Sequence, residues 1–213
     1  MTEETSFLEA VKKLRDEESK KGKERKFDQT IDLIVNLKEF DVRKQAFNVF
    51  AEIPHKFKER KIAGFFEKDS EAVSVIKKDD FGKYKEKKDI KKLIRSYDNF
   101  IANAKLMPAV ATSFGRVLGP AGKMPSPQLG ILPNEESEVV KKMVDRVNSN
   151  IRIVVKEASI KVGVARASLE DEKVVDNIIS VYHKILSSLP KGKDNVKNVK
   201  VKFTMSKPVG VEL

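Results

Sequence analysis

The stretch FDQTIDLIVNL (Phe27–Leu37) sets the fold class, because its apolar and polar residues alternate along the chain. Phe27 and the odd-numbered apolar residues of Ile31–Leu37 would share one face, and the other face would be polar apart from Ile34. A period of two is typical of a strand with one buried side and one side facing solvent. We therefore expect a sheet with an open polar face.

The same alternation of apolar and polar residues returns near the other end of the chain. Residues 151–155, 160–164 and 199–203 alternate in the same way, and Lys200 and Lys202 lie on the polar side of the last segment. Amphipathic helices are predicted over residues 6–20 and 170–189 from apolar residues at helical spacing. Such a strand can rest on a core and offer its lysines to a polyanion.

The middle of the chain has a different pattern of apolar residues. Near-continuous apolar strands are predicted at residues 61–66 and 99–102, and helices near 71–78, 90–97, from 107, and over 135–148. Strands alternating with helices indicate βαβ units around a parallel sheet. We therefore expect a discontinuous α+β domain of residues 1–57 and 153–213, interrupted by an inserted α/β domain of residues 58–152.

Composition excludes several classes of function. The chain of 213 residues has no cysteine, which rules out disulfides, zinc–thiolate sites and cysteine nucleophiles. The two histidines, His55 and His183, are far apart and are interpreted as structural, and no nucleophile has a plausible base. We therefore expect no enzyme activity, no metal and no cofactor. No apolar run approaches the ~20 residues of a membrane span, and the start does not resemble a signal peptide, so we expect no membrane partner and a cytoplasmic location.

The charge balance favours a nucleic-acid partner. Lys and Arg number 43 against 32 Asp and Glu, which gives a net charge of +11. The absence of tryptophan argues against a stacking groove for single strands but not against a duplex binder. The lysine-rich segment of residues 77–92 has two interpretations, a solvated helix face or a diffuse patch that attracts phosphates. A less specific hypothesis is that the chain is a basic interaction module that binds acidic proteins.

The loop GPAGKMPSPQLG (Gly119–Gly130) invites comparison with phosphate-binding loops. It does not fit a P-loop, because Val117 and Met124 stand where glycine and Ser/Thr are needed and its prolines lack N–H donors. Two interpretations stay open: a rigid surface loop, or a binding loop in which Lys123 contacts phosphate. The alternative function is a nucleotide-binding regulatory protein that uses the insert, but no glycine-rich turn follows a predicted strand.

Three motifs together resemble the L-one (uL-one) family of large-subunit ribosomal proteins, in its archaeal form. They are KFDQT (Lys26–Thr30), LGPAGKMP (Leu118–Pro125) with Pro127 and Gly130, and FTM (Phe203–Met205). The resemblance implies a split β-α-β sandwich built from both termini and interrupted by a Rossmann-like three-layer domain. It also implies a structural constituent of the large ribosomal subunit that is a monomer when free.

The resemblance further implies the partners of the chain. They are large-subunit rRNA at the mobile stalk beside the tRNA exit site, exit-site tRNA whose release is assisted, and a hairpin in the protein's own mRNA whose translation is repressed. The RNA-binding residues carried over from the family are Lys26, Phe27, Asp28, Thr30, Lys161, Gly163, Arg166, Thr204, Met205 and Ser206, with Lys123 as a secondary contact.

The chain departs from the family pattern at two of these motifs. Ser206-Lys207-Pro208 stands where the family usually has Gly-Pro, and Ala121 stands where an Arg is common. We expect lysines to supply salt-dependent affinity and Phe27, Thr204 and Met205 to supply recognition, although an aromatic residue on a strand's apolar face is usually part of a core.

Overall fold

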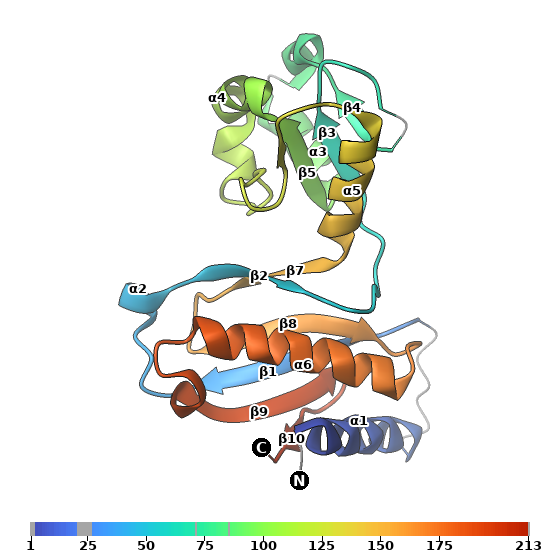
Figure 1. The fold of residues 1–213 in the computed structure, drawn as a ribbon, viewed down its shortest axis with the longest axis vertical. Helices are drawn as coiled ribbons and strands as arrows, with labels where there is room; N and C mark the ends of the chain where they lie inside the picture. Colours follow the sequence, from blue (N-terminus) through green and yellow to red (C-terminus); the bar gives the residue numbers. More distant parts are fainter. Residues whose placement is uncertain (1–2, 21–26, 71, 85, 213) are drawn as a thin grey trace. The chain divides into compact units, whose positions relative to one another are not determined.

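The computed structural model describes residues 3–20, 27–70, 72–84 and 86–212, and these form two compact units (Figure 1). Residues 1–57 and 149–213 make the terminal unit, and residues 58–148 make the insert. The second boundary therefore lies before residue 149 and not between 152 and 153. The reason is that β7 (Asn150–Val154) pairs antiparallel with β2 (Asn48–Glu52), so residues 150–152 belong to the terminal unit.

The terminal unit is built on an antiparallel sheet with the strand order β10-β9-β1-β8. Its strands are β1 (Thr30–Leu37), β8 (Ser159–Arg166), β9 (Val196–Phe203) and β10 (Val209–Val211). The N-terminal strand β1 lies between two C-terminal strands, which is why the two ends of the chain fold as one unit. The short helix α2 (Val42–Gln45) precedes β2.

Two long helices cover one face of this sheet. They are α1 (Glu3–Lys20) and α6 (Asp171–Ser188), which contact each other, while α1 contacts β9 and α6 contacts β8. Along β1, every second residue from Ile31 is buried in the core that these helices share, whereas the residues between them are half-buried. The other face of the sheet thus carries the polar residues, as the alternation predicts.

The insert is built on a parallel sheet with the strand order β4-β3-β5-β6. The strands are β3 (Ile62–Phe65), β4 (Ser74–Ile76), β5 (Asn99–Asn103) and β6 (Ile131–Leu132). The helices are α3 (Lys87–Ser96), α4 (Met107–Leu118) and α5 (Ser137–Asn148), with 3-10 turns at Lys78–Tyr84 and Ala104–Leu106. Phe65, Phe100 and Phe114 meet in the core, with Phe65 stacked on Phe100 at 5.7 Å between ring centroids.

The helix predicted over residues 71–78 is wrong. Its centre is strand β4, which pairs parallel with β3 from Ala63 to Phe65. Val75 and Ile76 are β-branched and suit a pleated strand, and Ile76 is buried in the core of the insert. Tertiary pairing therefore decides the conformation of this short segment.

Asn177 of α6 ties three parts of the terminal unit together. Its side chain is 0% exposed, accepts a hydrogen bond from the His55 N–H at 2.9 Å, and donates to the carbonyls of His55 and Val164 at 2.8 and 3.0 Å. We predict that Asn177→Ala lowers the free energy of unfolding by about 2–3 kcal/mol, because it leaves buried backbone groups unpaired.

The measurement is amide hydrogen exchange in α6 and β8. The matched control is Asn198→Ala, because Asn198 is exposed and accepts its hydrogen bond from the half-buried Asn36 side chain, so its loss should cost less than about 0.5 kcal/mol. Equal effects of the two variants would contradict the prediction.

Candidate nucleic-acid interface

The start of β1 and the end of β9 lie side by side. The Thr204 N–H donates to the Thr30 carbonyl at 3.0 Å, and the Thr204 hydroxyl donates to the same oxygen at 3.2 Å. Two motifs that are more than 170 residues apart in the sequence are thereby joined at one edge of the sheet. We call Phe27, Asp28, Thr30, Arg166, Thr204 and Met205 the strand-end cluster.

A tight turn presents Met205 to solvent. The Ser206 N–H donates to the Phe203 carbonyl at 3.1 Å, and the Ser206 hydroxyl oxygen accepts from the Phe203 N–H at 2.9 Å. Ser206, which stands where the family usually has glycine, therefore closes the turn with its own side chain. Met205 is 61% exposed as a result.

Phe27 is also exposed, at 55%, so it is not part of the core. It precedes β1, which begins at Thr30, and with Phe203 it lines a shallow hollow. Among the described residues, three large apolar side chains are exposed, and two of them are Phe27 and Met205. Exposed apolar side chains beside a polar sheet face are typical of a binding surface.

Asp28 holds the segment that follows β8. Its carboxylate accepts from the Ser168 N–H at 3.1 Å and from the Ser168 hydroxyl at 2.9 Å, and it pairs with Arg166 at 3.5 Å. Burial by itself would raise the pKa of Asp28, but these hydrogen bonds outweigh it and hold the pKa below its ordinary value. The structure thus gives Asp28 a positioning role, and a direct contact of Asp28 with RNA stays a prediction.

Arg15 of α1 holds the same segment from the other side. Its guanidinium donates to the carbonyls of Ala167 and Leu169 at 2.8 and 2.6 Å and pairs with Asp171 at 2.6 Å. Sequence reasoning missed Arg15 and Ser168, because no local pattern links a helix near residue 15 to a loop near residue 168. Together with Asp28 they fix the position of Arg166 at the edge of the strand-end cluster.

Three lysines lie in rows across the open face of the sheet. Lys161 of β8 and Lys200 of β9 both stand opposite Ile34 of β1, and Lys202 stands opposite Asp32. Side chains of directly opposed residues point to the same face of a sheet. The exposed Lys161 has only a long 3.8 Å pair with Glu157, which is worth little in water. We call Lys161, Lys200 and Lys202 the lysine rows.

Gly163 lets two side chains of β1 lie flat over β8. A Cβ atom at Gly163 would come within 2.9 Å of the Thr30 methyl and 3.4 Å of an Asp32 carboxylate oxygen. Burial raises the pKa of Asp32, and Lys202 offsets part of the increase. Asp32 is a residue of this face that the sequence-based site omitted, although the alternation of β1 placed it on the polar side.

Two expected contacts lie elsewhere. Lys26 falls outside the described residues, so its place in the site stays a prediction. Lys123 belongs to the insert, where its ammonium donates to the carbonyls of Ile94 and Tyr97, both at 2.7 Å. It therefore satisfies carbonyls at the C-terminal end of α3, and a phosphate contact of Lys123 also stays a prediction.

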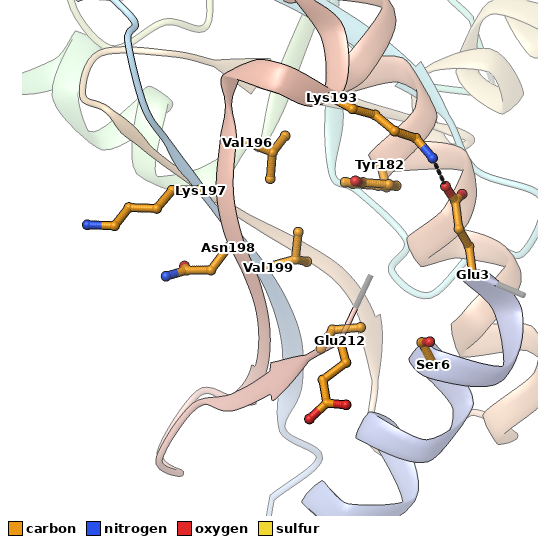
Figure 2. A pocket seen from close by; sticks show the side chains of 10 residues that line it. Glu3, Ser6, Tyr182, Lys193, Val196, Lys197, Asn198, Val199 and Glu212 are labelled. Atoms are coloured by element: carbon orange, nitrogen blue, oxygen red, sulfur yellow. Dashed lines mark hydrogen bonds and ion pairs between the residues drawn. The ribbon is translucent and has the colours of Figure 1, made fainter. Parts of the chain in front are cut away.

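The pocket drawn in Figure 2 lies at the start of β9, whereas Thr204 and Met205 follow the end of that strand. Its volume is about 760 Å³. Two of its charged side chains are paired with each other: Lys193 binds the Glu3 carboxylate, which His183 Nε2 also meets at 2.9 Å. His55 likewise meets Asp176 at 3.1 Å.

Within the described ranges, no group of acidic and histidine side chains is arranged to hold a metal ion, and no helix has the length and apolarity to cross a bilayer.

The role of Asp28 predicts a pH-dependent stability. Its folded pKa is lowered from an unfolded value of about 3.9, so the carboxylate stabilises the fold above that pH and loses this contribution as the pH falls through the folded pKa. We predict that Asp28→Asn lowers the free energy of unfolding by about 1 kcal/mol at pH 7, and that the difference from the unmodified chain disappears in strong acid. Urea denaturation at both pH values measures it.

Asp16→Asn is the control for this prediction, because Asp16 is an exposed acid on α1. A constant difference between Asp28→Asn and the unmodified chain at all pH values would show that Asp28 does not act through its charge.

The sequence matches known proteins along nearly its whole length. Residues 19–207 match the family described as "Ribosomal protein L1p/L10e family". The chain is 32% identical over 215 residues to the large ribosomal subunit protein uL1 of Nanoarchaeum equitans, which covers 96% of this chain and 98% of that protein. It is 34% identical to the protein of that name from Methanocaldococcus jannaschii, with 97% and 95% covered. The corresponding protein of Methanobrevibacter smithii is 33% identical, with 99% and 100% covered.

The family match over residues 19–207 covers the strand-end cluster, the lysine rows and the whole insert. Apart from Arg166, the residues of the strand-end cluster come from two motifs that resemble this family, and the structure joins these motifs at one edge of the terminal sheet. The chain belongs to the ribosomal protein L1 family.

Proposed function

We propose that the protein is a structural constituent of the large ribosomal subunit and that it binds rRNA through the strand-end cluster and the lysine rows. The observation that carries the proposal is the joining of Thr30 to Thr204, which sets the exposed Met205 beside the start of β1. The relatives' name, large ribosomal subunit protein, supports this assignment. The protein would act in the cytoplasm, on the ribosome, and be a monomer when free.

The chemistry of the cluster suits a structured RNA. The Thr204 hydroxyl uses its proton toward the Thr30 carbonyl, so its oxygen lone pairs are left to accept a hydrogen bond, which a ribose 2′-hydroxyl can donate. Met205 and Phe27 present apolar surface that can pack against a sugar or base. These contacts recognise shape, because a duplex of RNA displays its 2′-hydroxyls in a wide and shallow minor groove.

The lysine rows supply the part of the affinity that does not depend on sequence. Each lysine that neutralises a phosphate releases counterions, so binding weakens as salt rises. Lys161 and Lys200 flank the apolar Ile34, so their ammonium groups stand on either side of β1. A backbone of phosphates lying across β1 would meet both.

The finer assignment follows from the family resemblance. We place the rRNA site at the mobile stalk beside the tRNA exit site, where the protein assists the release of deacylated tRNA. A hairpin of similar shape in the protein's own mRNA would bind the same surface, and its translation would be repressed.

We predict that Met205→Asp weakens binding of the rRNA hairpin by about 1–3 kcal/mol, the scale of one good recognition contact. It replaces an exposed apolar contact by a charge that repels phosphate. The measurement is a gel-shift titration at fixed salt. Val154→Asp is the matched control, because Val154 is an exposed apolar residue on β7 of the same unit. An unchanged affinity for Met205→Asp would remove Met205 from the site.

We also predict that the double variant Lys200→Gln and Lys202→Gln lowers the slope of log affinity against log salt by about 2, since two phosphate contacts are lost. The control is Lys12→Gln with Lys13→Gln, two exposed lysines on α1, which packs against the opposite face of the sheet. If both pairs reduce the slope equally, binding depends on net charge alone and the lysine rows are not the site.

A further inference from the structure

The insert contains a place where α/β sheets commonly bind ligands. Strand β3 pairs with β4 on one side and with β5 on the other. The connection that follows β3 therefore leads to one side of it, and the connection that follows β4 leads back across to the other side. The carboxyl ends of β3 and β5 therefore form the switch point of this parallel sheet. Ligands of open α/β sheets lie in the crevice outside such a point.

An acidic side chain of the insert itself occupies this position. The Glu135 carboxylate accepts hydrogen bonds from the Glu67 N–H at 3.0 Å and the Lys68 N–H at 2.9 Å, which follow β3. It also accepts from the Asn103 amide at 2.6 Å, at the end of β5. Three donors from the ends of two neighbouring strands thus converge on one anion.

The donors are held in place by packing. The side chain of Phe66 is fully buried and lies over Gly64, where an added Cβ atom would come within 2.5 Å of the Phe66 ring. This packing fixes the direction of the chain just before the two N–H donors. Asn103 is 6% exposed, and its carbonyl oxygen accepts from the Lys105 N–H at 2.9 Å, which turns its NH2 group toward Glu135.

The electrostatics of the position favour a negative charge. Burial would raise the pKa of Glu135, but the hydrogen bonds from the Glu67 and Lys68 N–H groups and from Asn103, with the charge of Lys68, lower it below its ordinary value. Successive backbone N–H groups that point at one anion are the arrangement that binds phosphates in other proteins. The carboxylate thus stands where an oxygen pair of a phosphate group would stand.

We propose that the carboxyl ends of β3 and β5 form an oxyanion site whose occupant is the chain's own Glu135, and that the site accepts a phosphate group once Glu135 is withdrawn. A tethered carboxylate acts at a high effective concentration, so free phosphate does not displace it. The insert is therefore closed to nucleotides in the structure described, and Glu135 is the contact that closes it.

The test is a titration of the full-length, isotope-labelled protein with inorganic phosphate. The readouts are the NMR signals of the Glu67 and Lys68 amides and of the Asn103 side chain. These signals report on the proposed site itself, whereas total phosphate binding would also include phosphate attracted by lysines elsewhere. In Glu135→Ala we expect these three signals to shift and saturate, with an affinity at least about tenfold above that of the unmodified chain. Glu136→Ala is the matched control, because Glu136 is the adjacent exposed acid, and it should behave like the unmodified chain.

Two outcomes would overturn the proposal. One is a native spectrum of Glu135→Ala in which the three signals do not respond to phosphate. The other is an equal response in the unmodified chain, since Glu135 would then not be the occupant. Should Glu135→Ala fail to fold, Glu135→Gln takes its place, because the amide keeps one acceptor oxygen, and an intermediate affinity is expected.

A second arm of the titration replaces phosphate by ATP. Tighter binding of ATP than of phosphate in the Glu135 variant would identify a nucleotide site, and equal binding would identify a site for the phosphate group alone. Both results support the oxyanion site. No response to either ligand contradicts it and leaves the proposed rRNA function untouched, because the strand-end cluster lies in the other unit.

Discussion

The pairing of β1 with both β8 and β9 is the constraint on which the terminal unit depends. It places a strand from the start of the chain between two strands from its end, and it brings Thr30 to Thr204. A shift of one residue in this register would send every side chain of β1 to the other face. The core, the lysine rows and the strand-end cluster therefore all follow from one alignment of hydrogen bonds.

That alignment also accounts for the one breach in the alternation of β1. Ile34 is apolar but lies on the open face, opposite Lys161 and Lys200. Lysine side chains have long aliphatic stems that can cover apolar surface while the ammonium group stays in water. Ile34 is half-buried, and its two cross-strand neighbours on this face are lysines whose stems can cover part of its apolar surface.

The sequence predicted the elements whose pattern is long and regular. Periods of two and of 3.6 residues identified β1, β8, β9 and both long helices, because each buries one face along many residues. Strand β4 was missed because three residues cannot show a period and its conformation comes from pairing with β3. The hydrogen bonds of Asp28 and Glu135 were missed because both carboxylates bind backbone N–H groups of distant segments. Every residue except proline has such a group, so no pattern of residue types in the sequence reveals the partner. The resemblance identified Phe27, and only the structure shows that it lies before the strand and outside the core.

The two units use acidic residues in the same way within a basic chain. Asp28 and Glu135 each bind backbone N–H groups and fix a loop that follows a strand. Both carboxylates thus use their hydrogen-bonding capacity on groups of the same chain and hold local geometry. Lys161 on the open sheet face is in the opposite situation, since it has only a weak surface pair with Glu157. The electrostatic field that attracts a polyanion therefore depends on which charged side chains are paired within the protein and which face solvent, as well as on the net charge. For this reason the net charge alone could not locate the interface.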